Sequence, residues 1–240
     1  MNPPLALVGS GEYLPQMDGI DRVLLEATGK ERPRVALVPT AAGLEDPRVW
    51  TDMGCEHFAR LGAEPVAVFA VDRASCDEAR WADVVLQSDL VYFSGGQPHH
   101  LIASIKGSRL WAAVAKRHAE GAVLAGSSAG AMFLAERSFG FPDGFADNLP
   151  KRVELYDGVG LLPGLVILPH YDIIPAAATA RFRHVVPGGL RVVGIDEDTA
   201  LIRLNGQWSV AGKGSVWLLR DGRVESAFAS GADLPAGLLA

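Results

Sequence analysis

A serine at the junction of a predicted strand and a predicted helix is the side chain best placed for chemistry in this sequence. Residues 126–130 read Gly-Ser-Ser-Ala-Gly and follow the apolar run 121–125, which is typical of a buried strand. In a Gly-x-Ser-x-Gly turn the middle serine is exposed at the carboxyl end of the strand, because the flanking glycines carry no side chain that would clash. Ser128 is therefore the predicted nucleophile. A helix over 129–136 would point free backbone N–H groups at charge that develops beside it.

A serine hydroxyl needs a general base near neutral pH, and the sequence offers six histidines. His170 follows the strand-like run 165–168, so it is predicted at a strand end and is the first candidate. His99 and His100, just beyond two glycines, are the second choice. The other three lie in segments with helical spacing, where an imidazole usually has a structural role: His57, His118 and His184.

Three consecutive acids are candidates for the carboxylate that would orient the base. Asp196, Glu197 and Asp198 follow the apolar run 192–195, again at the end of a predicted strand. Any of them gives the chain order serine, histidine, acid. That order argues against the common α/β-hydrolase, in which the acid precedes the histidine.

The elements that must position these residues form an alternating pattern. Apolar runs typical of buried parallel strands are followed by segments with helical spacing, which indicates a βαβ succession. The predicted strands are 5–9, 35–39, 65–71, 90–94 and 122–126, and the predicted helices are 17–28, 47–61, 77–87 and 109–120. The predicted fold is α/β, with a mostly parallel open sheet, helices on both faces, and antiparallel strands over 192–219. The segment 139–157, rich in Gly, Pro and Asp, is predicted as a long loop near the site.

Composition limits the kinds of partner that the chain is expected to have. With 240 residues and 49% hydrophobic content, residues 1–240 are expected to form a single domain. The net charge is −6 and basic residues are scattered, which favours small-molecule or peptide chemistry over binding to nucleic acid or a membrane. Cys55 and Cys76 are interpreted as ordinary thiols, and the first residues lack a signal-peptide pattern. We therefore expect a cytoplasmic monomer or homodimer.

Several segments, in the same order along the chain, resemble one family of serine peptidases. This family includes aspartyl dipeptidase (peptidase E) and cyanophycinase and has a class I glutamine amidotransferase-like α/β fold. The similar segments are 5–12, 38–43, 93–97, the turn around Ser128, 158–164, 169–171 and 194–201. The resemblance covers most of the chain.

The resemblance implies a Ser-His-Glu triad, which falls on Ser128, His170 and Glu197. It therefore favours Glu197 over the two neighbouring aspartates. It also implies an oxyanion hole made of the backbone N–H groups of Gly95, Gly96 and Ala129. Loss of one such donor typically costs about a hundredfold or more in turnover. No metal and no other cofactor is expected.

Departures from the family pattern concern the substrate. Cyanophycinase-like sequences carry closely spaced arginines after the active-site histidine, whereas residues 172–178 contain none. Aspartyl dipeptidases resemble this chain in having arginine farther downstream, so Arg181 or Arg183 is expected to bind a substrate carboxylate. Gln97 matches a position that is Asn or Asp in these relatives and is expected to contact the substrate.

The function predicted first is a serine exopeptidase or dipeptidase for short peptides, with acidic residues as one candidate preference. A cyanophycinase-like hydrolase of side-chain-linked peptides is an alternative. Another alternative, from a different class, is a non-catalytic binding module on the same scaffold. A glutamine amidotransferase would need cysteine in the turn where Ser128 stands, and neither Cys55 nor Cys76 is there.

Overall fold

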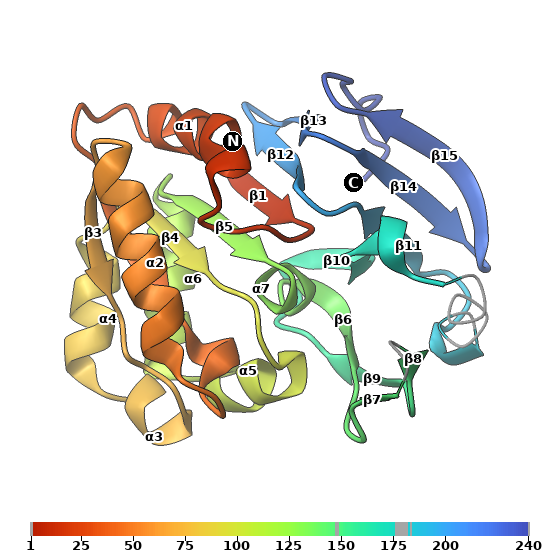
Figure 1. The fold of residues 1–240 in the computed structure, drawn as a ribbon, viewed down its shortest axis with the longest axis horizontal. Coiled ribbons are helices and arrows are strands. Elements are labelled where there is room, and N and C mark those ends of the chain that lie inside the picture. The colour runs from red at the N-terminus through yellow and green to blue at the C-terminus, as the bar shows by residue number, and fades with distance from the viewer. Residues whose placement is uncertain (1, 147–148, 176–181, 183, 240) are drawn as a thin grey trace.

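The computed structural model describes residues 2–146, 149–175, 182 and 184–239, and these form two main sheets (Figure 1). The first sheet has the strand order β13-β12-β1-β5-β4-β2-β3. The neighbouring strands β1, β5, β4, β2 and β3 are parallel to one another. Strand β12 pairs antiparallel with β1, and β13 pairs antiparallel with β12. The bounds are β1 (Leu5–Val8), β2 (Arg34–Val38), β3 (Glu64–Ala67), β4 (Leu90–Phe93), β5 (Val123–Ser127), β12 (Thr199–Leu204) and β13 (Gln207–Gly212).

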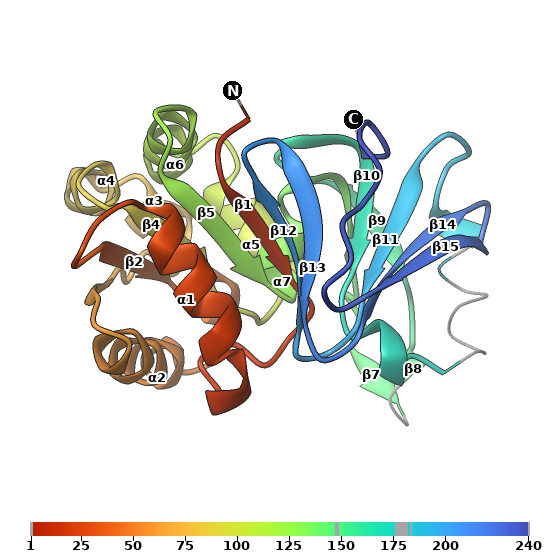
Figure 2. The ribbon, with the colours of Figure 1, turned by 90° about the horizontal axis from the view of Figure 1, so that it is seen from above.

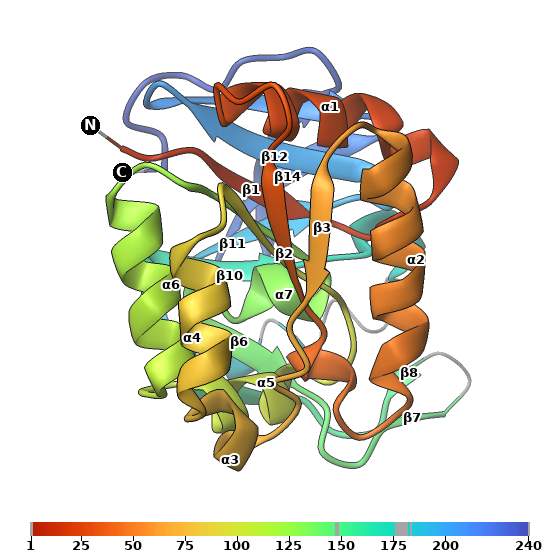
Figure 3. The same ribbon diagram turned by 90° about the vertical axis from the view of Figure 1, so that its left-hand side faces the viewer.

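Helices cover both faces of the parallel part of this sheet (Figures 2 and 3). Successive strand residues point to opposite faces, so Leu5 and Leu7 join one hydrophobic cluster while Ala6 and Val8 join the other. One face packs against α1 (Asp18–Ala27) and α2 (Pro47–Arg60). The other packs against α4 (Ala79–Leu86), α5 (Pro98–Ile105) and α6 (Arg109–Ala119). The predicted α/β fold with helices on both faces is thus confirmed.

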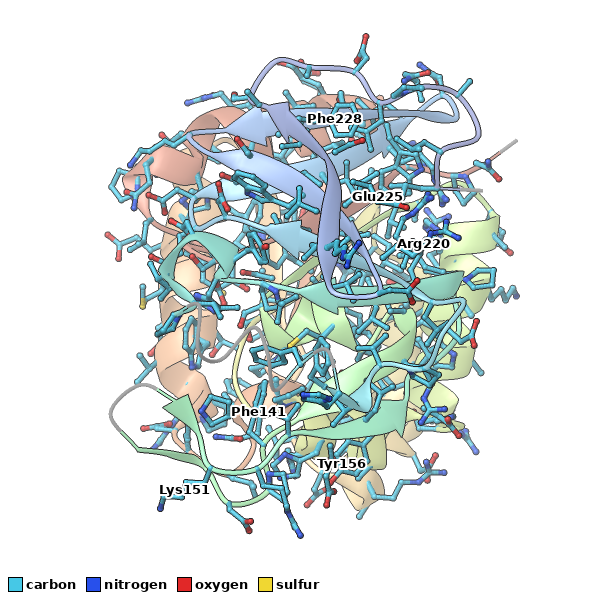
Figure 4. All side chains as sticks on the ribbon, turned by 90° about the vertical axis from the view of Figure 1, so that its right-hand side faces the viewer. Phe141, Lys151, Tyr156, Arg220, Glu225 and Phe228 are labelled. Atoms are coloured by element: carbon cyan, nitrogen blue, oxygen red, sulfur yellow. The ribbon has the colours of Figure 1, made fainter. Side chains whose placement is uncertain are left out.

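A second sheet lies beside the first and has the order β15-β14-β11-β10-β6-β9. Its centre, β6, β10 and β11, is parallel, and the strands at its two edges are antiparallel. The bounds are β6 (Ala135–Gly140), β9 (Glu154–Asp157), β10 (Leu162–Leu168), β11 (Arg191–Ile195), β14 (Ser215–Arg220) and β15 (Arg223–Ala229). An ion pair of 3.3 Å between Arg220 Nε and Glu225 Oε1 lies at the β14–β15 hairpin (Figure 4).

The second half of the chain differs from its sequence-based prediction in three places. The helix predicted over 129–136 is the four-residue α7 (Ala129–Met132), because the chain from Ala135 pairs with β10 as strand β6. The predicted loop 139–157 instead contains the end of β6, the hairpin β7 (Phe145–Ala146) and β8 (Leu149–Pro150), and β9. The strands predicted as antiparallel over 192–219 divide between the two sheets, and the first of them, β11, is parallel to its neighbour β10.

Short elements complete the described part of the chain. These are α3 (Arg73–Cys76) and the 3₁₀ turns η1 (Pro15–Met17), η2 (Thr40–Ala42) and η3 (Tyr171–Ile173). Throughout the ranges that the structure describes, every helix is too short or too polar to traverse a lipid bilayer.

Candidate active site

Ser128 lies on a strained turn between β5 and α7. Its backbone angles are φ 50° and ψ −114°, a conformation that L-residues rarely adopt. The turn is tight on both sides: a Cβ on Gly126 would collide with the carbonyl oxygen of Gly130, and one on Gly130 would collide with that of Phe93. Both glycines of the Gly-x-Ser-x-Gly pattern are therefore required by close backbone approach.

His170 and Glu197 reach Ser128 from the second sheet. His170 follows β10 and Glu197 follows β11, and because these strands are parallel neighbours their carboxyl ends lie together. Ser128 Oγ is 3.0 Å from His170 Nε2, and His170 Nδ1 is 2.9 Å from Glu197 Oε1. The carboxylate favours the tautomer with hydrogen on Nδ1, which leaves Nε2 free to accept the serine hydroxyl.

The two aspartates that flank Glu197 have other partners. Asp196 accepts hydrogen bonds from Trp217 Nε1 at 2.9 Å and from the backbone N–H of Ser215 at 2.8 Å. Burial raises the pKa of this carboxyl, and both hydrogen bonds oppose that rise. Asp198 pairs with Lys213 Nζ at 2.9 Å. Of the three acids proposed from the sequence, only Glu197 contacts His170 among the described residues.

The remaining histidines are not placed to act as the general base. His57 Nε2 is 2.7 Å from buried Asp21 Oδ2, and His118 Nδ1 is 3.0 Å from the carbonyl of Ala122. Burial also lowers the pKa of His118. His100 Nε2 is 2.8 Å from the carbonyl of Val71, and neither it nor His99 is among the described residues lining the cavities at Ser128. His184 is exposed. The structure therefore gives none of them a position beside the nucleophile.

The three predicted oxyanion donors differ in what their N–H groups do. Gly95 N–H donates to Glu12 Oε1 at 2.7 Å and is already engaged. The N–H groups of Gly96 and Ala129 have no acceptor among the described residues, and both residues adjoin the Ser128 turn. An oxyanion hole at this turn would therefore consist of Gly96 and Ala129, with Gly95 in a supporting position.

Glu12 is a residue of the site to which the sequence analysis assigned no role. It is 5% exposed, and while Oε1 accepts from Gly95, Oε2 accepts from Ser127 Oγ at 2.6 Å. One carboxylate thus joins the turn after β4 to the residue that precedes Ser128. The available signal in the sequence was its position: Glu12 follows the predicted strand 5–9, and ligand sites in open α/β sheets lie beyond the carboxyl ends of the strands.

Two hollows are lined by Ser128 and His170. One, of about 480 Å³, has a mostly apolar lining that includes Gln97, one of the predicted substrate-binding residues. The other, of about 500 Å³, carries the carboxyl groups of Glu12, Glu197 and Asp198. The other two predicted substrate-binding residues, Arg181 and Arg183, lie outside the described residues.

A serine on a strained strand-to-helix turn, with a histidine at its hydroxyl and a carboxylate at the far ring nitrogen, defines the class of serine-type hydrolases. Comparison with known proteins gives the particular family. The model for Peptidase family S51 matches residues 5–210, and the chain belongs to this family.

Relatives of known name and structure agree with this assignment. A cyanophycinase from Synechococcus elongatus is 28% identical over 193 residues, which are 77% of this chain and 58% of that protein. The chain thus spans less than two thirds of the length of that cyanophycinase. The uncharacterized peptidase YgaJ of Bacillus subtilis is 27% identical over 72% of this chain and 70% of its own length. A crystal structure of a peptidase from an acI-B1 Actinobacterium superposes with a TM-score of 0.84 at 30% identity, covering 98% and 97% of the two chains.

Proposed function

We propose that this protein is a serine peptidase that hydrolyses short peptides through an acyl-enzyme. The observation that carries the proposal is the hydrogen-bonded series from Ser128 through His170 to Glu197, built from two sheets. A vestigial binding module has no need of this alignment, nor of a strained backbone at Ser128.

In the proposed reaction, Ser128 Oγ attacks the carbonyl carbon of the scissile bond while His170 Nε2 takes the hydroxyl proton. Glu197 stabilises the imidazolium that forms. The oxyanion of the tetrahedral intermediate accepts hydrogen bonds from the N–H groups of Gly96 and Ala129. As the intermediate collapses, the C–N bond breaks and His170 gives its proton to the leaving amine.

The acyl-enzyme is then resolved by water. His170 takes a proton from the water, the hydroxide adds to the ester carbonyl, and the second intermediate expels Ser128 Oγ, which regains a proton from His170. The side chains of the described residues suffice for these steps.

The substrate preference depends on the residues that line the two hollows. A preference for acidic residues would depend on Arg181 and Arg183, because the described lining of both hollows contains no arginine or lysine. A cyanophycinase-like activity is favoured by the similarity to cyanophycinase and disfavoured by the absence of arginine from 172–178. Exopeptidase or dipeptidase action, a cytoplasmic location and a monomeric or homodimeric state remain predictions.

Replacement of the nucleophile tests the proposal. Ser128→Ala should lower peptide hydrolysis by about a thousandfold or more, because the attacking oxygen is removed while the backbone turn is kept. Hydrolysis of a dipeptide and tripeptide library, with blocked and free termini, is the measurement. Ser226→Ala, on β15 at the edge of the second sheet, is the matched control and should be fully active. Undiminished hydrolysis in Ser128→Ala would show that another group attacks the substrate.

A further inference from the structure

The apolar hollow beside Ser128 has the shape and lining of a pocket for one substrate side chain. We propose that it binds a large apolar side chain of a residue flanking the scissile bond, so that the enzyme prefers leucine, methionine or phenylalanine there. This inference rests on the proposed peptidase function and names the substrate class of the same site.

The floor of the pocket is part of the hydrophobic core. Met132, Leu168 and Phe182 line it and are 2%, 3% and 6% exposed, and all three belong to the cluster between α7 and the second sheet. Phe182 packs edge-on against Phe139 and Phe141, with ring centroids 4.9 and 6.2 Å apart. Such packing fixes the aromatic wall in place.

The rim continues the apolar surface up to the catalytic groups. Ile173 and Ile174 lie three and four residues after His170, and Pro98 begins α5 just after the Gly96 turn. Ile173 is 60% exposed, a large aliphatic side chain open to solvent beside the pocket. Phe141, which packs against Phe182, is half-buried and also lines the pocket. An apolar side chain can therefore lie on continuous apolar surface while its backbone reaches Ser128.

The charges around the two hollows differ. Among the described residues that line the apolar pocket, none is Asp, Glu, Lys or Arg, and polar groups come from Gln97, Ser128 and His170. A carboxylate or ammonium buried there without a partner would lose its hydration, at a cost in binding free energy. An apolar side chain gains by leaving water. The acidic residues near Ser128 instead line the second hollow. The apolar part of a peptide should therefore bind in the apolar pocket rather than in the second hollow.

The size of the pocket fits a large side chain. Its volume of about 480 Å³ lies in the lower part of the range of roughly 300–1,000 Å³ found for sites that bind small molecules. The pocket thus has room for leucine or phenylalanine. Because these side chains would bury more apolar surface than alanine, the pocket should favour them over alanine as well as over aspartate.

A matched peptide series tests the inference. The two residues that flank the scissile bond are varied in turn among Ala, Leu, Phe, Asp and Lys, and kcat/KM is measured for each. At one of these positions Leu or Phe should exceed Ala by about ten- to a hundredfold, with Asp and Lys below Ala. The inference is overturned if Ala equals Leu and Phe at both positions, or if Asp is preferred over them at both.

A substitution at the rim should change this preference. Ile174→Arg places a guanidinium beside the pocket, so kcat/KM for the Leu peptide should fall and that for the Asp peptide should rise. Leu44→Arg, at an aliphatic residue that is 65% exposed and lines neither hollow, is the matched control and should leave the ratio unchanged. Equal Leu-to-Asp ratios in both variants and the unaltered protein would contradict the assigned pocket.

Two further measurements separate this inference from the peptidase proposal. Arg181→Ala and Arg183→Ala should keep the preference for Leu over Asp, and loss of that preference in either would assign specificity to these arginines instead. Calorimetric binding of uncleaved Leu and Asp peptides to Ser128→Ala should favour Leu. If Leu peptides bind but no cleavage depends on Ser128, the peptidase proposal fails alone. If cleavage depends on Ser128 but follows Asp, only the apolar pocket is wrong.

Discussion

Glu12 has the clearest untested role at the scale of single residues, because its carboxylate joins two turns of the site. Glu12→Ala would leave Gly95 N–H and the Ser127 hydroxyl buried without their acceptor, at about 1–3 kcal/mol for each group. Since both adjoin the proposed catalytic groups, we expect kcat to fall at least tenfold, with a smaller change in KM. Steady-state kinetics beside denaturant unfolding is the measurement.

The conservative variant separates positioning from mere stabilisation. In Glu12→Gln the amide oxygen can accept from Gly95, and the amide N–H can donate to Ser127 Oγ after the hydroxyl rotates. Most of kcat should therefore return. If Glu12→Ala is less stable but retains kcat, Glu12 supports the fold and does not position the site.

The residues of the site differ in how far the sequence alone predicted them. Ser128 and His170 were identified by local patterns, a glycine-flanked turn and a strand end. The local pattern did not distinguish Glu197 from Asp196 and Asp198, because what separates them is distant in sequence: Trp217 and Ser215 engage Asp196, and Lys213 engages Asp198. The family resemblance selected Glu197. Glu12 received no role because its partners lie more than 80 residues away.

At the scale of elements, η3 contacts the loop after β11 beside the proposed catalytic residues. Asp172 Oδ1 accepts the backbone N–H of Glu197 at 2.9 Å, which links the turn after His170 to the residue that orients its ring. We expect Asp172→Ala to lower kcat/KM several-fold. Its melting temperature should change little, because Asp172 is exposed and the loss is one hydrogen bond of about 1 kcal/mol.

The matched variant Asp172→Asn keeps an acceptor oxygen and should remain close to the unaltered protein in kcat/KM. Activity that is equally low in both variants would point to the charge of Asp172 rather than to its hydrogen bond. Full activity in both would show that the Glu197 loop holds its position without this contact.

The elements themselves were predictable where their signal is local. Helical spacing predicted α1, α2, α4 and α6 to within a few residues of their observed bounds. The helix at Ser128 was predicted too long, and β7, β8 and β9 were missed. Those strands exist through pairing, as between β9 and β6, and their residues carry no strong alternation of their own.

At the scale of the whole molecule, the site lies where the two sheets meet. Ser128 follows strand β5 of the first sheet, while His170 follows strand β10 of the second. Residues 196–198 cross from β11 in the second sheet to β12 in the first, and Glu197 is in the middle of that crossing (Figure 1). We therefore expect the alignment of the proposed catalytic groups to depend on how this crossing is held.

Asp196 connects residues 196–198 to β14 by hydrogen bonds, and its removal should affect stability and activity together. It is 7% exposed and accepts from both Ser215 N–H and Trp217 Nε1. Asp196→Ala leaves these two donors unpaired, so we expect the free energy of unfolding to fall by about 2–4 kcal/mol. At about 2–4 °C for each kcal/mol in a chain of this size, the melting temperature should drop by about 4–16 °C. Because Glu197 is adjacent, kcat should fall as well at temperatures where the variant is folded.

The control variant is Asp83→Ala, at an exposed residue of α4, which should leave the melting temperature and kcat unchanged. A destabilised Asp196→Ala with full kcat would show that the two sheets hold the catalytic alignment without this contact.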